Sequence, residues 1–211
     1  MANVLAFAVL GFMGVRLVTG LRRSRTVQGK TVVQQVIKTA GWRHVWPVPF
    51  MLATVVAVAT GLMALPGLKW GWWSMLGGSG NPVFGSSDAT SGTVWELIIP
   101  LLFMCLLFPA LPLFAYAEER MFRTGAEGWS TSRRVLKVVQ FGLIHAVIGI
   151  PLGAALALSI GGAYFMWVYL RSYRAHGNPQ AATIESTTAH AVYNAAVVAI
   201  VVLAIVLDAV L

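Results

Sequence analysis

The fold is decided by residues 95–117, which read WELIIPLLFMCLLFPALPLFAYA and end directly before two adjacent glutamates. This stretch is apolar apart from Glu96, and about 20 apolar residues are enough for a helix to cross the hydrocarbon core of a bilayer. We therefore expect a membrane-spanning helix here. Because proline lacks a backbone donor and clashes with the preceding turn, Pro109 and Pro112 predict a kink within it.

The composition of the whole chain agrees with this reading. The 211 residues are 58% hydrophobic and 10% charged, and the mean hydropathy is +0.76. Soluble domains carry about 25% charged residues, so this chain belongs to the membrane class. We expect one integral membrane domain over residues 1–211, built as an all-α, polytopic helical bundle. Cys105 is the single cysteine, which excludes an internal disulfide and a cysteine-rich metal site.

Further apolar stretches bring the expected number of spans to about six. Residues 138–170 are too long for one span and contain GIPLG, which predicts two helices joined by a tight turn at Pro151; one long kinked helix is the alternative. The other expected spans are the stretch at residues 95–117 and those at residues 3–21, 47–65 and 188–211.

The segments between the spans have their own character. The stretch TVVQQVIKTAGWRHVW predicts an amphipathic helix at the membrane interface, with Trp42 and Trp46 at headgroup level. Residues 66–93 read as a loop whose WGWWSM segment rests on the opposite interface, and residues 171–187 read as a polar connection. We expect His44 and His176 to lie in loops without a role, and Glu127 and Glu185 to be loop charges.

The placement of the basic residues predicts the orientation in the membrane. Threading the six spans alternately puts every Lys and Arg except Lys69 on one side, and this side is cytoplasmic by the positive-inside rule. The chain is then a multi-pass protein of the plasma (inner) membrane with both termini outside. Because the basic residues lie in short loops beside spans and no nucleic-acid-binding motif is present, the expected partner is the lipid bilayer, not nucleic acid.

The same threading brings polar groups from three spans to similar depth. Glu118 and Glu119 fall at the cytoplasmic end of the span at 95–117, and His145 lies about 12 Å into the next span. His190 and Asn194 occupy the first turns of the last span, entering from the same side. Ionisable residues inside a membrane are costly and mark functional sites, so this agreement in depth predicts one site.

Spacing within the helices supports the same site. Three pairs are separated by four residues and so share a helix face: Glu119 with Arg123, Phe141 with His145, and His190 with Asn194. Arg123 can neutralise Glu119. Glu118 is turned by about 100° from its neighbour, which leaves its carboxylate available to a water as a general base.

Three motifs in this region resemble those of one protein family. The segment EERMFRTG resembles the E-E-x-x-x-R motif of the CPBP intramembrane endopeptidases, which include the type II CAAX prenyl endopeptidase. Its second motif, F-x-x-x-H, is matched by FGLIH at residues 141–145, and its third, H-x-x-x-N, by HAVYN at residues 190–194. The motifs follow the family order, and the resemblance covers about residues 95–200, the expected catalytic core.

The resemblance implies an enzyme that hydrolyses peptide bonds with a glutamate and without a required metal or other cofactor. Carried over to this chain, Glu118 with His145 would activate the water. His190 and Asn194 would form an oxyanion hole, in which each donor is worth about 3–4 kcal/mol.

The same resemblance assigns a supporting role to two further residues and a class of substrate. Glu119 with Arg123 would shape the site. The substrate would be a membrane-associated peptide or protein, lipid-modified or not, cut at the cytoplasmic leaflet.

Three other functions fit the same residues. A zinc protease could use His145, His190 and a glutamate as ligands, although the chain lacks an H-E-x-x-H motif. A b-type haem could take the same two histidines as axial ligands. A non-enzymatic immunity or scaffold protein could keep the fold, with the glutamates as a solvated ion pair and His190 with Asn194 as interhelical hydrogen-bonding groups.

Overall fold

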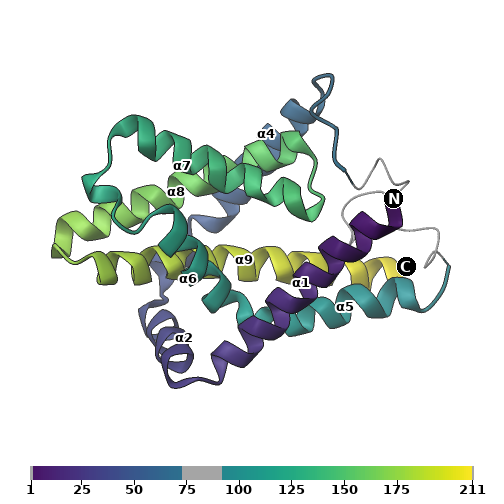
Figure 1. Cartoon of the computed structure of the whole chain (residues 1–211), viewed down its shortest axis with the longest axis horizontal. Helices are drawn as coiled ribbons and strands as arrows, with labels where there is room; N and C mark the ends of the chain where they lie inside the picture. The colour runs from purple at the N-terminus through teal and green to yellow at the C-terminus, as the bar shows by residue number, and fades with distance from the viewer. Residues whose placement is uncertain (1, 73–91, 211) are drawn as a thin grey trace.

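The computed structural model describes residues 2–72 and 92–210, and all regular structure within them is helical (Figure 1), which confirms the all-α class. The α-helices are α1 (Ala2–Ser24), α2 (Val27–Thr39), α3 (Trp42–Val45), α4 (Val48–Met63), α5 (Trp95–Leu107), α6 (Leu111–Phe122), α7 (Thr131–Leu143), α8 (Leu152–His176) and α9 (Pro179–Val210). Short 3-10 helices are η2 (Phe108–Ala110), η3 (Ala126–Gly128) and η4 (Ile144–Ile148). Most of the loop expected at residues 66–93, including the end of WGWWSM, lies outside the described residues.

Four helical stretches of the described chain are long and apolar enough to cross a membrane: Trp42–Met63, Trp95–Gly128, Leu152–His176 and Pro179–Leu207. These support a membrane protein, but six spans were expected. The other two expected spans correspond to α1 and to α7 with η4. Neither α1 nor α7 with η4 is among the four stretches, and α7 carries Arg133, Arg134 and Lys137.

The kink predicted from Pro109 and Pro112 is present. The 3-10 turn η2 separates α5 from α6, and Pro112 lies in the first turn of α6. After the break, α6 follows a course different from that of α5 and crosses α9, with which it is in contact (Figure 1).

The two-helix interpretation of residues 138–170 is confirmed. Between η4 and α8, Gly149 adopts φ +91°, a left-handed conformation that glycine tolerates without strain, and Pro151 caps α8. The hairpin packs closely because two glycines lie in the interface. A Cβ on Gly142 would lie 2.5 Å from the carbonyl oxygen of Ala155, and one on Gly162 would lie 2.8 Å from the Phe141 ring.

The expectation of a polar connection at residues 171–187 is wrong. Only Gly177 and Asn178 separate α8 from α9, so the last helix begins well before residue 188. The polar side chains at the start of α9 are compatible with a buried helix because their hydroxyls bond to the helix itself. Thr183, Thr187 and Thr188 each donate to the carbonyl oxygen four residues earlier.

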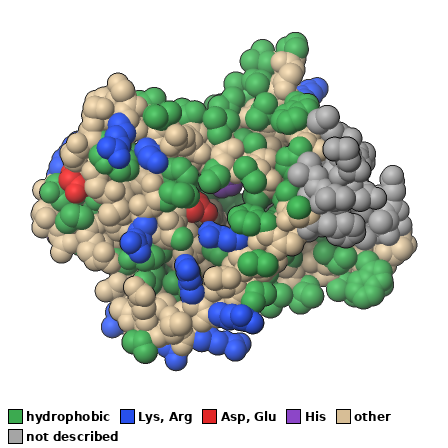
Figure 2. Space-filling view, in the orientation of Figure 1, with side chains coloured by type: hydrophobic (Ala, Val, Ile, Leu, Met, Phe, Trp, Pro, Cys, Tyr) green, Lys and Arg blue, Asp and Glu red, His purple; other side chains and the backbone are tan. Residues whose placement is uncertain are grey.

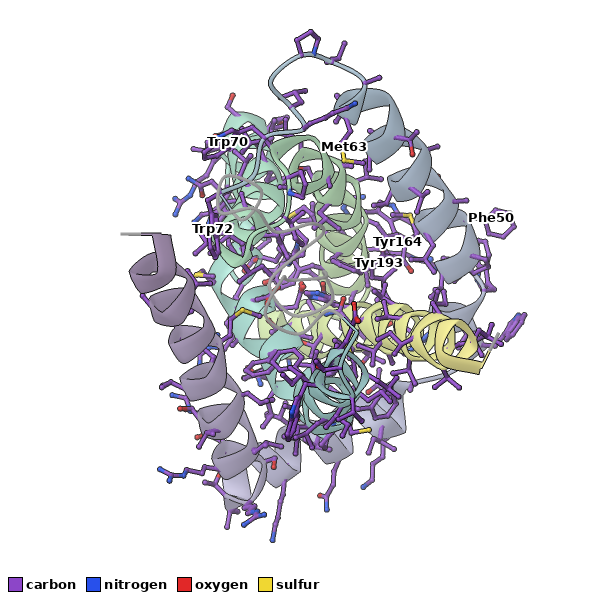
Figure 3. All side chains as sticks on the ribbon, turned by 90° about the vertical axis from the view of Figure 1, so that its right-hand side faces the viewer. Phe50, Met63, Trp70, Trp72, Tyr164 and Tyr193 are labelled. Carbon is purple, nitrogen blue, oxygen red and sulfur yellow. The ribbon has the colours of Figure 1, made fainter. Side chains whose placement is uncertain are left out.

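The centre of the bundle is α9, which contacts α2, α3, α4, α5, α6 and α8. The amphipathic helix expected over residues 31–46 is divided between α2 and α3, with a break at Ala40 and Gly41, and the apolar face of α2 packs on protein. Val32 and Val36 lie against Ala115 of α6 and Ala191 of α9. Near α4, Tyr164 of α8 and Tyr193 of α9 lie close together (Figure 3) and belong to one hydrophobic cluster.

Candidate active site

The site is built around Glu119, which is fully buried at the end of α6. Arg123, one turn later, donates from Nη1 to Glu119 Oε1 over 2.6 Å and from Nη2 to the carbonyl oxygen of Gly162 over 3.4 Å. Its guanidinium carbon lies 4.2 Å above the centre of the Phe141 ring. The ion pair predicted from the four-residue spacing therefore exists, and it is entirely removed from solvent.

His190 from α9 joins this pair. Its Nδ1 lies 2.9 Å from Glu119 Oε1, and its ring stacks on Phe165 of α8 at 4.4 Å between centroids. Phe141 packs edge-on against the same ring at 5.4 Å. A carboxylate on Nδ1 and aromatic rings on two sides hold the imidazole in one orientation, with Nε2 directed away from Glu119.

Glu118 has different surroundings from its neighbour. Its Oε2 atom is buried and has no hydrogen-bond partner among the described residues. The nearest cationic or ring nitrogen is Nε2 of His190 at 3.8 Å, which is too long for a direct hydrogen bond. Oε2 therefore keeps an unfilled acceptor position beside His190. That Glu118 holds a water stays a prediction from the sequence.

Glu118 also opens on a cavity of about 500 Å³. His145 lines the same cavity, and its Nδ1 bonds to the carbonyl oxygen of Phe141 over 2.8 Å, so that Nε2 is left for a ligand. The rest of the wall is mainly apolar and comes from α1, α5, α6 and η4, including Phe12, Leu17, Phe103, Phe114, Met121 and Ile148. In Figure 2 acidic and histidine side chains are visible within a hollow near the middle of the face.

Asn194 is the predicted site residue that makes no hydrogen bond, ion pair or ring contact with the other six among the described residues. It is half-buried one turn after His190 on α9, and neither residue lines the cavity itself. The six other predicted residues do converge: Glu118, Glu119, Arg123, Phe141, His145 and His190.

Three residues of the site were missed from the sequence. Ser186 donates to the second carboxylate oxygen of Glu119 and to the Phe165 carbonyl oxygen. It lies four residues before His190, and this spacing of polar residues in a helix was the signal available. Phe165 had no comparable signal within its apolar run. Arg16 lines the cavity with its guanidinium 5.8 Å from the Phe114 ring, instead of lying apart from the site.

The loop positions expected for His44, His176 and Glu185 are wrong, because these residues lie in α3, α8 and α9. Glu185 lies on α9, where Arg43 donates to it over 2.9 Å and His44 lies 3.1 Å from its other oxygen. His44 is only 3% exposed, in contrast to the loop position expected. Glu127 lies in η3 and accepts a hydrogen bond of 2.7 Å from the Tyr169 hydroxyl. The expectation failed because these polar residues bond to partners that are distant in the sequence.

The described residues contain no group of three or more His, Cys, Asp or Glu side chains arranged to hold a metal ion. Comparisons with models of protein families, with curated proteins and with solved structures find no match.

Proposed function

We propose that this protein is a glutamate-dependent intramembrane endopeptidase of the CPBP type. The observation that carries the proposal is the position of Glu118: its unpaired Oε2 faces His190 Nε2 at 3.8 Å and its side chain opens on the cavity that His145 also lines. A scaffold protein has no need to keep an unpaired carboxylate oxygen at this depth, because a buried polar atom without a partner costs about 1–3 kcal/mol.

The proposed reaction begins with a water held by Glu118. The carboxylate takes one proton from the water as its oxygen attacks the peptide carbonyl, and His145 supports the water from the other side of the cavity. The carbonyl π electrons move onto its oxygen, and the C–N bond then breaks as Glu118 returns the proton to the leaving nitrogen. The products are a carboxylic acid and an amine.

His190 and Asn194 are proposed to stabilise the tetrahedral intermediate. Glu119 holds the Nδ1 side of the imidazole, which leaves Nε2, in its protonated form, to donate to the oxyanion. Asn194 lies one turn away on the same face of α9, and its amide would join the site when substrate widens the gap beside α9. Arg123 keeps Glu119 ionised and in place and does not touch the substrate.

The apolar cavity wall supports a membrane-associated peptide or protein as substrate. A water-soluble peptide gains little from a wall of Phe, Leu and Ile side chains, whereas a segment delivered from the bilayer buries its apolar surface there. We further propose the six-span topology, with α1 and α7–η4 as the additional spans and the site near the cytoplasmic leaflet.

The test is a comparison of peptides in cells that express wild-type chain or Glu118→Gln from the same plasmid. A direct substrate accumulates uncut in the variant, and its cleavage products disappear. Glu96→Gln is the matched control, because Glu96 is an exposed carboxylate on α5 that does not line the cavity. His145→Ala and His190→Ala are expected to behave as Glu118→Gln does.

Identical peptide profiles for wild type and Glu118→Gln, with equal amounts of folded protein, would reject the enzyme and favour a scaffold or immunity protein. Two further measurements on the purified protein address the other candidates. Loss of cleavage in a chelator that returns with zinc would favour the zinc protease, and a Soret band would favour the haem protein.

A further inference from the structure

A second cavity, of about 220 Å³, shares no lining residue with the cavity beside Glu118. It is formed where α3, the end of α8 and the start of α9 meet, and the polar and aromatic side chains of its wall are Arg43, His44, Tyr164, Trp167, Arg171, Ser172, His176 and Glu185. Neither the proposed reaction nor the packing of the bundle uses this cavity.

The charges within this cavity do not balance. Glu185 is paired with Arg43, at 2.9 Å. His44 accepts the Gly41 N–H at Nδ1, so its ring proton is on Nε2 and is donated to Glu185, which makes His44 a neutral donor in this arrangement. Arg171 has no acidic partner within 4.0 Å in residues 2–72 and 92–210. His176 also lines the cavity and bonds through Nδ1 to the carbonyl oxygen of Ser172. Arg171 therefore supplies a positive charge without an acidic partner at this cavity.

The aromatic wall places this charge at the level of the lipid headgroups. Arg171 lies 5.2 Å from the Trp167 ring, and Trp167 in turn stacks on Tyr164 at 6.1 Å. Trp167 is 53% exposed, and Trp42 and Trp46 beside the cavity are also exposed. Tryptophans on the outer surface of a membrane protein gather at the boundary between headgroups and acyl chains.

We propose that this cavity binds the headgroup of an anionic phospholipid that carries a single negative charge, such as phosphatidylglycerol. Arg171 receives the phosphodiester, whose charge balances its own, and Trp167 with Tyr164 packs against the glycerol and the upper acyl chain. A choline headgroup fits less well, because its cation would compete with Arg171 for the Trp167 face. The proposal does not depend on the peptidase reaction.

The test measures lipid binding to the detergent-purified full chain by native mass spectrometry. Dioleoyl-phosphatidylglycerol and dioleoyl-phosphatidylcholine are titrated separately, and we expect one tightly held phosphatidylglycerol. Arg171→Gln should weaken its binding about tenfold or more, the size expected for losing one hydrogen bond between charged groups. Arg174→Gln is the matched control, because Arg174 is an exposed arginine on the same helix that does not line the cavity.

A further variant moves the affinity in the opposite direction. Glu185→Gln removes the carboxylate that competes for Arg43 while keeping a side chain that His44 can bond, so phosphatidylglycerol should bind more tightly. A cavity with only a structural role would not produce this gain. Melting temperatures of all variants establish that each is folded.

Three results would overturn the proposal: equal affinity for the two lipids, equal binding by Arg171→Gln and Arg174→Gln, or no gain in Glu185→Gln. Displacement of phosphatidylglycerol by an equal concentration of glycerol 3-phosphate would also overturn it, because the site would then recognise a soluble phosphate without the lipid.

Discussion

Glu118 and Glu119 are neighbours in the chain, but their surroundings assign them different tasks. Both oxygens of Glu119 are occupied, by Arg123 and His190 on one side and by Ser186 on the other. Glu118 is 26% exposed at its side chain and keeps one oxygen without a hydrogen-bond partner in the described chain. A carboxylate with every acceptor site filled holds a structure together, whereas one with an open site can take a proton.

This contrast predicts that replacing Glu119 by Gln lowers the free energy of unfolding far more than the same replacement at Glu118. Glu119→Gln removes the charge from a fully buried pair and strands Arg123, so the free energy of unfolding should fall by about 3–5 kcal/mol. Glu118→Gln should change it by less than about 1 kcal/mol, because no buried partner is lost. Denaturant titration of both variants in detergent checks this. Equal destabilisation by both would contradict the separation of roles.

Arg123 should be as sensitive as its partner. It is the largest fully buried side chain among the described residues, and Arg123→Ala leaves the Glu119 charge facing Phe141 and Phe165. We expect a loss of about 3–5 kcal/mol in the free energy of unfolding. Arg120→Ala, an exposed arginine on the same helix, is the control and should cost less than about 1 kcal/mol. A small effect of Arg123→Ala would mean that the ion pair is dispensable.

At the scale of the elements, the hairpin of α7 and α8 positions two rings of the site. Phe141 fits between Arg123 and His190 only because Gly162 presents no side chain to it. Gly162→Ala places a Cβ 2.8 Å from the Phe141 ring and 3.2 Å from the Val138 carbonyl oxygen, so α7 must move away.

We expect Gly162→Ala to lower the free energy of unfolding by about 1–3 kcal/mol. Cleavage should also be abolished, because His145 is displaced with α7. Gly161→Ala is an adjacent control on the same helix, because its Cβ would meet only Phe165, at an ordinary 3.7 Å. Melting temperature and the peptide assay measure the two effects. If both glycine variants behaved like the wild type, close packing of the hairpin would not be what positions the site.

The elements also show which parts of the fold could be predicted. Local signals were sufficient for the break at Pro109, the turn at Pro151 and the pair of Glu119 with Arg123, because each depends on residues within one turn of one another. The start of α9 was not predicted, because Glu185 and Ser186 look like loop residues until their partners on α3 and α6 are known. Long-range pairing of buried polar groups leaves no pattern within a single segment.

At the scale of the whole molecule, the open matter is how many helices cross the membrane. The two ends of the chain lie at the same end of the bundle in Figure 1, and α1 packs against α5, η2 and α6 of the apolar stretch Trp95–Gly128. Lys and Arg side chains on the visible face gather mainly toward the opposite end, over α2 and α7, as Figure 2 shows. An even number of crossings, with the basic end in the cytoplasm, agrees with both features.

Single-cysteine labelling tests this orientation. Cys105 is exposed on α5 and is replaced by Ala first, after which one cysteine is introduced at Ser24, Ser130, Asn178 or Lys69. We expect a membrane-impermeant maleimide to label Lys69→Cys in intact cells, because this position follows α4 at the outer end. The other three should react only after the membrane is opened, since they end α1 or lie between α6 and α7 or between α8 and α9. Labelling of Ser130→Cys in intact cells would show that the carboxylates lie at the outer leaflet. A cytoplasmic substrate could then not reach Glu118.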